Sequence, residues 1–209
     1  MRKEKKTAVQ KRQSFIETAR RRQLIECAIE TIASLGYARA SLSEIARRAK
    51  TSKGVISYHF ASKDALIQEV VGTIFAAADA FMKAETAGGS TAADLLRSYI
   101  RSNVEFLRTH RKEVLALVYI LTTARDRKGK PLMDATKYDP VIEAVEQILK
   151  RGQKEGDFRR FSTRVMAVAI RGAIDGIPGQ MMAHPDLDLS AYAEEMVVLF
   201  DRATRTKRA

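Results

Sequence analysis

The sequence predicts an all-α protein, in which a long helix joins an N-terminal three-helix helix-turn-helix head to a larger C-terminal helical bundle. Three observations support this prediction. Apolar residues recur at helical spacing along most of the 209 residues. No alternating run of β-branched and aromatic residues, bounded by turn residues, indicates a strand. The 4 prolines stand at positions 131, 140, 178 and 185, so most of the chain can remain helical.

The composition is that of a globular protein with an anionic partner. Hydrophobic residues make up 45% and charged residues 30%, which excludes a disordered or fibrous chain. The net charge of +12 favours nucleic acid or an acidic membrane. Residues 1–64 hold 15 Lys and Arg against 6 Asp and Glu, residues 65–201 hold 18 against 19, and residues 202–209 hold 4 against 0. The anion-binding surface is therefore expected near the N-terminus.

Several classes of protein are disfavoured. The lone Cys27 excludes an internal disulfide and a multi-cysteine zinc site. The longest weakly polar run, 70–82, is shorter than the roughly 18 residues of a membrane span, and no secretory signal is evident. His59, His110 and His184 are scattered, and no phosphate-binding glycine loop occurs. We therefore expect a cytoplasmic protein that is not an enzyme, has no cofactor or metal, and does not bind a membrane.

The N-terminal segment begins with a basic arm over residues 1–18. Its cations are Arg2, Lys3, Lys5, Lys6, Lys11 and Arg12. Because little burial could offset the entropy of ordering it, we expect the arm to be flexible until it meets a polyanion. A first helix is predicted over 19–35, with Leu24, Ala28 and Ile32 on one stripe and Gly36 as its stop.

Two short helices and a long one follow. Ser41 and Glu44 form a capping-box pattern, in which the hydroxyl and the carboxylate would each accept a backbone N–H, so a helix begins there and ends near Lys50. Ser52 caps a third helix through residue 60, and Ser62 caps the long helix 62–86. Two short helices joined by a minimal turn have the form of a helix-turn-helix.

The rest of the chain reads as amphipathic helices separated by turns. Their predicted ranges are 91–109, 111–125, 139–155, 162–175 and 189–204. Asp139 followed by proline is a start signal, and Gly156 and Gly176 are stop signals. The charged segment 125–138 is the longest loop candidate and is expected to be a mobile lid.

The run SLSEIARRAKTSKGVISYHFASKDAL, residues 41–66, closely resembles the DNA-binding signature of the TetR family of bacterial transcriptional repressors. The later segments EGDFRRFS and AIDG are also similar to that family. The residue pattern supports the likeness independently, because Ile56 and Phe60 give the third helix one apolar face and leave Ser57 and Tyr58 on the other. A basic helix with such side chains suits a major groove.

The predicted DNA-binding residues are Ser41, Ser43, Ser52, Lys53, Gly54, Val55, Ser57, Tyr58, His59 and Lys63. The resemblance implies phosphate contacts for Lys53 and Lys63, which could otherwise be ordinary solvated lysines. Gly54 allows close approach of the backbone to DNA, or else tight helix packing, and Tyr58 could be half-buried in packing. Ser43 and Ser57 depart from the family, which often has a longer polar and an aromatic residue there.

The resemblance further implies a homodimer whose C-terminal bundle binds a small-molecule effector. Candidate pocket residues are Phe75, Phe81, Phe106, Tyr119, Met133, Met166 and Met181, and for each of them plain core is the favoured alternative. Candidate dimer residues are Ala169, Gly172, Ala173, Tyr192, Met196, Leu199 and Phe200, for which an intrachain core is the alternative. The predicted parts are the flexible arm (1–18), a DNA-binding domain (19–65), an effector-binding and dimerisation domain (66–204) and a basic tail (205–209).

The predicted function is a sequence-specific regulator, a repressor that a small molecule releases from its double-stranded DNA operator. Two rival functions are a non-specific DNA-organising protein without an effector and a membrane-surface protein whose arm binds acidic lipid. The near-neutral middle of the chain and the specific helix-turn-helix residues argue against both rivals.

Overall fold

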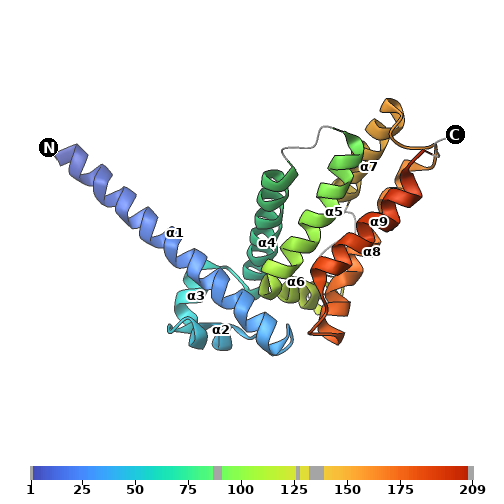
Figure 1. Ribbon diagram of the computed structural model, residues 1–209. Helices are drawn as coiled ribbons and strands as arrows, with labels where there is room; N and C mark the ends of the chain where they lie inside the picture. Colours follow the sequence, from blue (N-terminus) through green and yellow to red (C-terminus); the bar gives the residue numbers. More distant parts are fainter. Residues whose placement is uncertain (1, 87–90, 126–127, 132–138, 207–209) are drawn as a thin grey trace. The chain divides into compact units, whose positions relative to one another are not determined.

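The computed structural model describes residues 2–86, 91–125, 128–131 and 139–206, excepting the side chains of residues 2–14, 85 and 86. Regular structure within these ranges is helical (Figure 1), apart from two isolated β-bridges. The helices are α1 (Arg2–Leu35), α2 (Leu42–Arg48), α3 (Lys53–His59), α4 (Lys63–Thr86), α5 (Ala92–Thr109), α6 (Arg111–Thr123), α7 (Asp139–Glu155), α8 (Thr163–Ala183) and α9 (Leu189–Thr204). The predicted all-α class, with a helix-turn-helix head and a C-terminal helical bundle, is confirmed.

The first helix is longer than predicted. It begins at Arg2 rather than at residue 19, and it ends as expected at Gly36, whose φ of 75° suits a glycine. Residues 2–18 are rich in Lys, Arg, Glu and Gln and lack Gly and Pro, so local helix propensity favours continuing the helix. The predicted start of the first helix at residue 19 is therefore wrong, because a shortage of apolar residues does not by itself end a helix. Contact of the arm with a polyanion stays a prediction.

Helix α8 also exceeds its prediction. Gly176 was expected to stop it, yet the helix continues through Pro178 to Ala183. The reason is burial, since Ile170, Ile174 and Ile177 continue one stripe into the core and are all 0% exposed. Keeping that stripe buried outweighs the local cost of a glycine and a proline.

The chain divides into two compact units. The head unit comprises residues 1–74 and 115–132, and the body unit comprises residues 75–114 and 133–209. Helices α4 and α6 therefore each contribute residues to both units. These bounds follow packing and are not those of the predicted functional domains, which stay a prediction.

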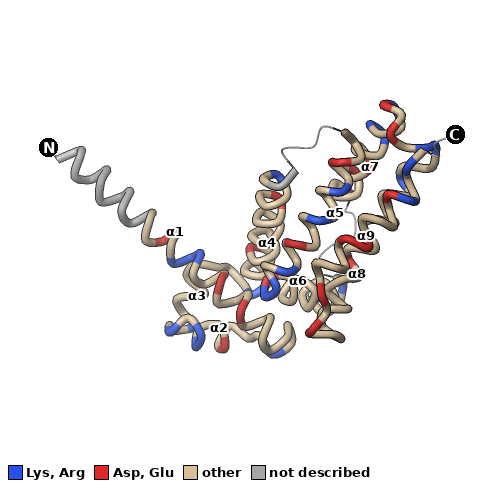
Figure 2. Tube along the Cα trace, in the orientation of Figure 1, with Lys and Arg blue, Asp and Glu red and all other residues tan. Residues whose placement is uncertain are grey.

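In the head unit, α1 packs on α2 and α2 on α3. Its core is made by fully buried aliphatic side chains from each helix, among them Leu24, Ile32, Ile45, Ile56, Leu66 and Ile67. In the body unit, α5 packs against α7, α8 and α9, and α7 packs against α8. Figure 2 shows Lys and Arg interspersed with Asp and Glu along α5 to α9, in keeping with the near-neutral charge of that region.

Helix α4 is long and apolar enough over residues 63–84 to cross a membrane by length and composition alone. This stretch extends on both sides of the weakly polar run 70–82. In the structure Leu66 and Val70 are buried in the head unit, while Phe81 and Met82 pack against the body core. Packing inside protein thus accounts for part of the apolar composition of α4, since 28% of the apolar stretch is buried.

Candidate nucleic-acid interface

The two short helices of the head begin at the predicted caps. The Ser41 hydroxyl accepts the backbone N–H of Glu44 at 3.2 Å. The reciprocal half of the predicted capping box is wrong, because the Ser41 N–H donates to the Arg39 carbonyl and the Glu44 carboxylate pairs with Arg47 at 2.8 Å. Ser52 caps α3 by accepting the N–H of Val55 at 3.4 Å. Each of the two helices therefore begins at the serine that the sequence predicts as its cap.

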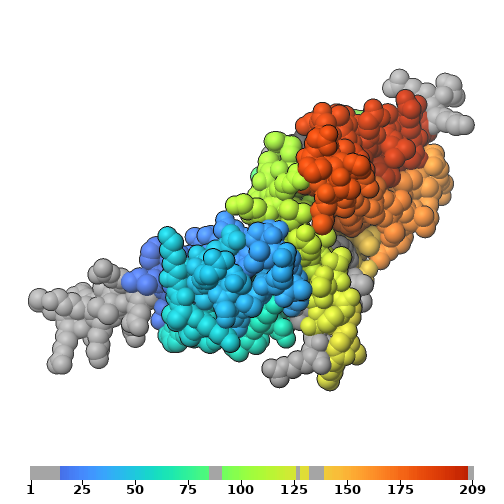
Figure 3. Space-filling model, turned by 90° about the horizontal axis from the view of Figure 1, so that it is seen from below, coloured from blue at the N-terminus to red at the C-terminus, as the bar shows by residue number. Residues whose placement is uncertain are grey.

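Helix α3 is attached to the head by few apolar side chains. Ile56 is 0% exposed and Phe60, directly after the helix, is 3% exposed. Of the predicted DNA-binding residues, seven are exposed, namely Ser41, Ser43, Ser52, Lys53, Gly54, Ser57 and Tyr58, and three are half-buried, namely Val55, His59 and Lys63. Figure 3 shows the surface that α1, α2 and α3 form on the head unit (blue to cyan). The structure thus brings the predicted set together on the two short helices and the start of α4.

Tyr58 and His59 differ in what they offer to solvent. The Tyr58 side chain is 75% exposed, so the alternative of half-buried packing does not apply to it. The His59 ring meets the Tyr58 ring edge to face, with 5.1 Å between their centroids. Tyr58 therefore presents its hydroxyl outward while His59 supports one edge of its ring.

The environment of Gly54 separates the two explanations offered for it. A Cβ added at this position would meet only the Ser52 hydroxyl within 4 Å, at an ordinary 3.6 Å. Tight packing against another helix therefore does not explain the glycine. The exposed backbone of α3 leaves room for another molecule to approach, and its close approach to DNA stays a prediction.

The two predicted phosphate-binding lysines have different surroundings. Lys53 is exposed at the first residue of α3. Lys63 lies at the first residue of α4 with its Nζ 4.3 Å from the centre of the Tyr37 ring and 3.4 Å from the Tyr37 carbonyl oxygen. Burial lowers the pKa of the Lys63 ammonium, and the Asp64 carboxylate opposes this shift. Tyr37 thus holds Lys63 in place, a contact that the spacing of the sequence did not signal.

The candidate pocket residues do not form one cluster. Phe81 and Phe106 meet edge to face at 5.7 Å, and His110 stacks on Phe106 at 4.2 Å. Met166 and Met181 both contact the body core but stand 15 residues apart on α8, about 22 Å along the axis. Phe75 is half-buried in the body unit, Tyr119 belongs to the head unit, and Met133 lies outside the described residues. A single small pocket could reach only part of this set.

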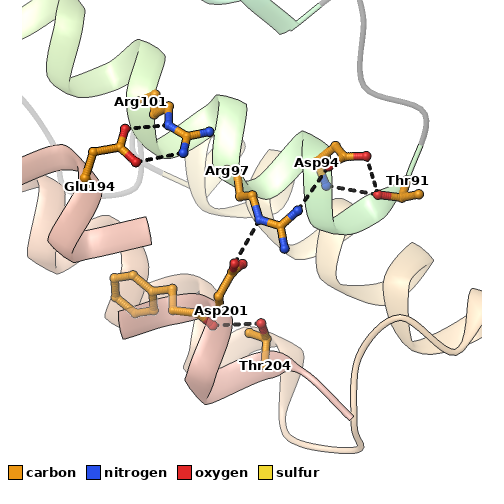
Figure 4. A network of polar contacts seen from close by, with 8 residues as sticks. Thr91, Asp94, Arg97, Arg101, Glu194, Asp201 and Thr204 are labelled. Atoms are coloured by element: carbon orange, nitrogen blue, oxygen red, sulfur yellow. Dashed lines mark hydrogen bonds and ion pairs between the residues drawn. The ribbon is translucent and has the colours of Figure 1, made fainter. Parts of the chain in front are cut away.

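A groove lies between α5 and α9, where none was expected. Its volume is about 540 Å³, and its lining includes Arg101, Ser102 and Arg108 of α5 with Leu189 and Glu194 of α9. None of the candidate pocket residues lines it. Figure 4 shows the ion pairs that join these helices beside the groove, Arg101 with Glu194 and Arg97 with Asp201. Each is on the surface and contributes little to stability by itself.

A buried guanidinium also joins α8 to α5. Arg171, with 15% of its side chain exposed, donates to the Asn103 amide oxygen at 2.9 Å and to the Tyr99 hydroxyl at 3.2 Å. Burial acts to lower the pKa of Arg171, but the hydrogen bonds to Asp175 and Tyr99 prevail and raise it. The cluster fixes the inner side of α8 with a permanent charge.

The candidate dimer residues fall into groups by burial. Ala169, Gly172 and Leu199 are exposed. Ala173 and Tyr192 are partly buried and pack against the body core. Met196 and Phe200 are 5% and 6% exposed inside that core, so for these two the structure shows the intrachain alternative.

Other exposed apolar residues were missed. Val165 and Val168 on α8 and Val198 on α9 are 68%, 47% and 40% exposed. On α8, residues 165, 168, 169, 172, 176 and 179 follow helical spacing along one exposed stripe. This spacing is visible in the sequence. It does not indicate whether this stripe of α8 or the stripe of Ile170, Ile174 and Ile177 faces outward.

Known proteins resemble most of the chain. The transcriptional regulator BetI 1 of Chromohalobacter salexigens is 24% identical over 164 residues, covering 76% of this chain and 81% of that protein. The A-factor receptor protein of Streptomyces griseus is 27% identical over 179 residues, covering 84% of this chain and 60% of that protein. The regulator FadR of Bacillus subtilis, solved in complex with stearoyl-CoA, has a TM-score of 0.72 at 20% identity and covers 85% of this chain and 95% of that one. This last likeness shows that the fold is shared.

A helix-turn-helix that projects an exposed second helix, with Lys53 at its start, is the form found in many DNA-binding transcriptional regulators. Residues 24–70 match the model of the bacterial regulatory proteins of the tetR family. The chain belongs to the TetR family of bacterial transcriptional regulators.

Proposed function

We propose that the chain is a repressor that binds a duplex operator through α2 and α3 as a homodimer and leaves it when a small molecule binds the body. The observation that carries the proposal is the outward face of α3. Lys53, Ser57 and Tyr58 are exposed there, while Ile56 and Phe60 hold the helix to the head. Ammonium and hydroxyl groups on one exposed helix suit phosphates and base edges in a major groove.

Within the interface the residues have different roles. Lys53, Tyr58 and Lys63 are the proposed phosphate contacts, which set affinity for any sequence. Ser43, Val55 and Ser57 are the proposed discriminators of bases. The exposed backbone of Gly54 lets α3 approach the groove closely.

The proposed homodimer forms when two copies of this chain meet at the outer faces of α8 and α9. The exposed stripe of α8, with Val165 and Val168, and the exposed Leu199 of α9 supply an apolar surface. Cβ atoms added at Gly172 and Gly176 would meet nothing within 4 Å, so these glycines leave room for a second helix. Two-fold symmetry would place two α3 helices about 34 Å apart on a palindromic duplex, bound by one dimer or by paired dimers.

The proposed effector binds in the body unit. One relative is named a receptor for A-factor and one similar structure holds stearoyl-CoA, which favours a ligand-responsive body here. Helix α4 has residues in both units and is about 36 Å long, so a tilt of a few degrees at its body end would move its head end by about 2 Å. A shift of that size would break several phosphate contacts together.

Selection of duplexes from a random library by the purified protein tests DNA recognition. We expect a palindromic consensus that outcompetes unrelated duplex by at least about a thousandfold. Equal affinity for all sequences would instead favour the DNA-organising alternative. Binding to acidic vesicles without affinity for DNA would favour the membrane-surface alternative.

Sedimentation of the protein alone and with the selected duplex tests the dimer. A stable monomer in both conditions would contradict the proposed assembly.

A thermal-shift screen of a metabolite library tests the effector, because a ligand of the folded state raises the melting temperature. Calorimetry then measures the affinity of each ligand found with and without saturating operator. If a ligand lowers the affinity of the protein for its operator by some factor, linkage requires that the operator lower the affinity for the ligand by the same factor. Equal ligand affinity in both conditions would contradict release by that ligand.

A further inference from the structure

The C-terminal end of α3 is held by a residue that lies far from it in the sequence. The guanidinium of Arg21, on α1, donates through Nη1 to the carbonyl oxygen of His59, the last residue of α3. Its other terminal nitrogen, Nη2, donates to Glu69 Oε1 on α4 at 2.7 Å. Its central carbon lies 4.3 Å from the centre of the Phe60 ring. One side chain of α1 therefore contacts both the end of α3 and α4. All of these contacts lie within the head unit.

These contacts use the particular geometry of arginine. A planar guanidinium can stack on an aromatic face while its N–H groups point in fixed directions within its plane. A cation at the end of a helix also interacts favourably with the carbonyl groups that have no partner within the helix. Lysine could replace one of these contacts, but it cannot stack and donate in two fixed directions together.

The end of α3 is where small movements would matter most for recognition. The helix has 7 residues, and Ile56 is its fully buried one, so few contacts fix its rotation about its own axis. Tyr58 stands next to His59 and rests against its ring. A displaced His59 carbonyl would therefore redirect Tyr58 and, half a turn away on the same short helix, Ser57.

We propose that Arg21 is a positioning residue for DNA recognition, which sets the orientation of α3 through His59 and Phe60 and ties it to α4 through Glu69. This rests on the proposed function of α3 as the recognition helix. Arg21 acts through the direction of Ser57, a proposed discriminator of bases, and does not itself bind phosphate.

A direct phosphate contact is the competing role, since 39% of the Arg21 side chain is exposed. The two roles differ in what they predict. Loss of a phosphate contact weakens binding to every duplex. It also reduces the salt slope, the steepness with which the logarithm of the binding constant falls with the logarithm of the salt concentration, by about 0.9. Loss of positioning weakens binding to the operator and leaves binding to unrelated duplex, with its salt slope, unchanged.

The experiment compares Arg21→Ala and Arg21→Lys with wild type on two duplexes, one selected from a random library by the wild-type protein and one unrelated. We expect both variants to lose at least about fivefold in operator affinity and less than about twofold on unrelated duplex. Arg39→Ala is a matched control, because Arg39 caps the end of α1 by donating to the Leu35 carbonyl at 2.9 Å and carries the same charge. Circular dichroism and melting curves confirm folding, and Arg21→Lys serves if Arg21→Ala fails to fold.

A double-mutant cycle with Ser57→Ala completes the test. If Arg21 acts through Ser57, the fold-loss of the double variant on the operator is well below the product of the single losses. Full additivity, an equal loss on unrelated duplex, or unchanged operator affinity would each overturn the inference. Failure of wild type to prefer any duplex would instead contradict the proposed function.

Discussion

Two helices of this chain carry exposed glycines, and the neighbours of those glycines differ. On α3, Gly54 follows the exposed Lys53, whereas on α8, Gly172 and Gly176 share a stripe with the exposed Val168. A glycine costs a helix about 1 kcal/mol relative to alanine, and none of these three meets a close neighbour within the chain. Each therefore marks a place where another molecule can approach the backbone.

The charge of the surroundings distinguishes the two partners. The head holds most of the positive charge, so the exposed backbone of α3 suits a polyanion. The stripe on α8 is apolar and lies in a near-neutral region, which suits a second protein surface. These surroundings support the proposals that α3 meets DNA and that α8 meets a second copy of the chain.

Replacement of Arg171 tests the inner side of α8, where no partner is expected. Arg171→Ala would leave the buried Asn103 and Tyr99 without their donor, and we expect the free energy of unfolding to fall by about 3 kcal/mol. Denaturant unfolding at fixed protein concentration measures the change. Arg101→Ala, which breaks an exposed ion pair, should cost less than about 1 kcal/mol. Equal losses would mean that the Arg171 cluster is no more important than a surface pair.

A charge on the outer side of α8 should instead change assembly. Gly172→Glu has open space for its side chain, so the fold should survive while the apolar stripe acquires a charge. We expect a monomer in sedimentation and a loss of roughly a hundredfold in operator affinity, because one head binds without its partner. Gly72→Glu on α4 is the matched control, since Gly72 is also exposed, helical and without close neighbours. If both variants remain dimeric, the stripe of α8 is not the interface.

Removal of Lys53 tests the charge of α3. Lys53→Ala should weaken binding to operator and unrelated duplex alike, by about tenfold at low salt, and reduce the salt slope by about 0.9. Fluorescence anisotropy titrations over a series of salt concentrations give both quantities. Lys154→Ala removes the same charge from the exposed surface of α7 and should leave them unchanged. A change of base preference at constant salt slope would show that Lys53 reads bases.

The smallest effect is expected from a single methyl group on α3. Gly54→Ala should raise the free energy of unfolding by up to about 1 kcal/mol, because alanine favours a helix and the added Cβ meets only Ser52 at 3.6 Å. The same methyl group should lower operator affinity by about threefold to tenfold if the backbone lies close to DNA. Gly172→Ala offers the comparison on α8, with the same helix gain and no direct effect on DNA contacts. A more stable Gly54→Ala protein with full operator affinity would refute close approach at that position.

The head was the more predictable part, because its signals are local. Ser41, Ser52 and Ser62 cap the next three helices as predicted, each through its own hydroxyl. The predicted role of Glu44 failed because Arg47 lies one turn away and competes for the carboxylate. Capping is decided within a few residues, so the sequence fixes it except where a neighbouring charge intervenes.

The body was less predictable, because an apolar residue there can pack either into the core of its own chain or against another molecule. Met196 and Leu199 are both apolar residues of α9, yet one is in the core and the other is 58% exposed. Gly176 and Pro178 read as a stop, while the buried stripe of Ile174 and Ile177 keeps α8 helical. Periodicity identifies an apolar face but not the molecule that covers it.

The sequence by itself determined the helical class, the helix-turn-helix, the division of charge and the side chains that α3 presents. These properties depend on residues within one or two helical turns or on composition alone. The tertiary structure decided which stripe of α8 faces outward, that Tyr37 holds Lys63, and that Arg21 contacts the end of α3 from 38 residues away. Such contacts join residues distant in sequence, and they depend on how the helices pack, which no local pattern encodes.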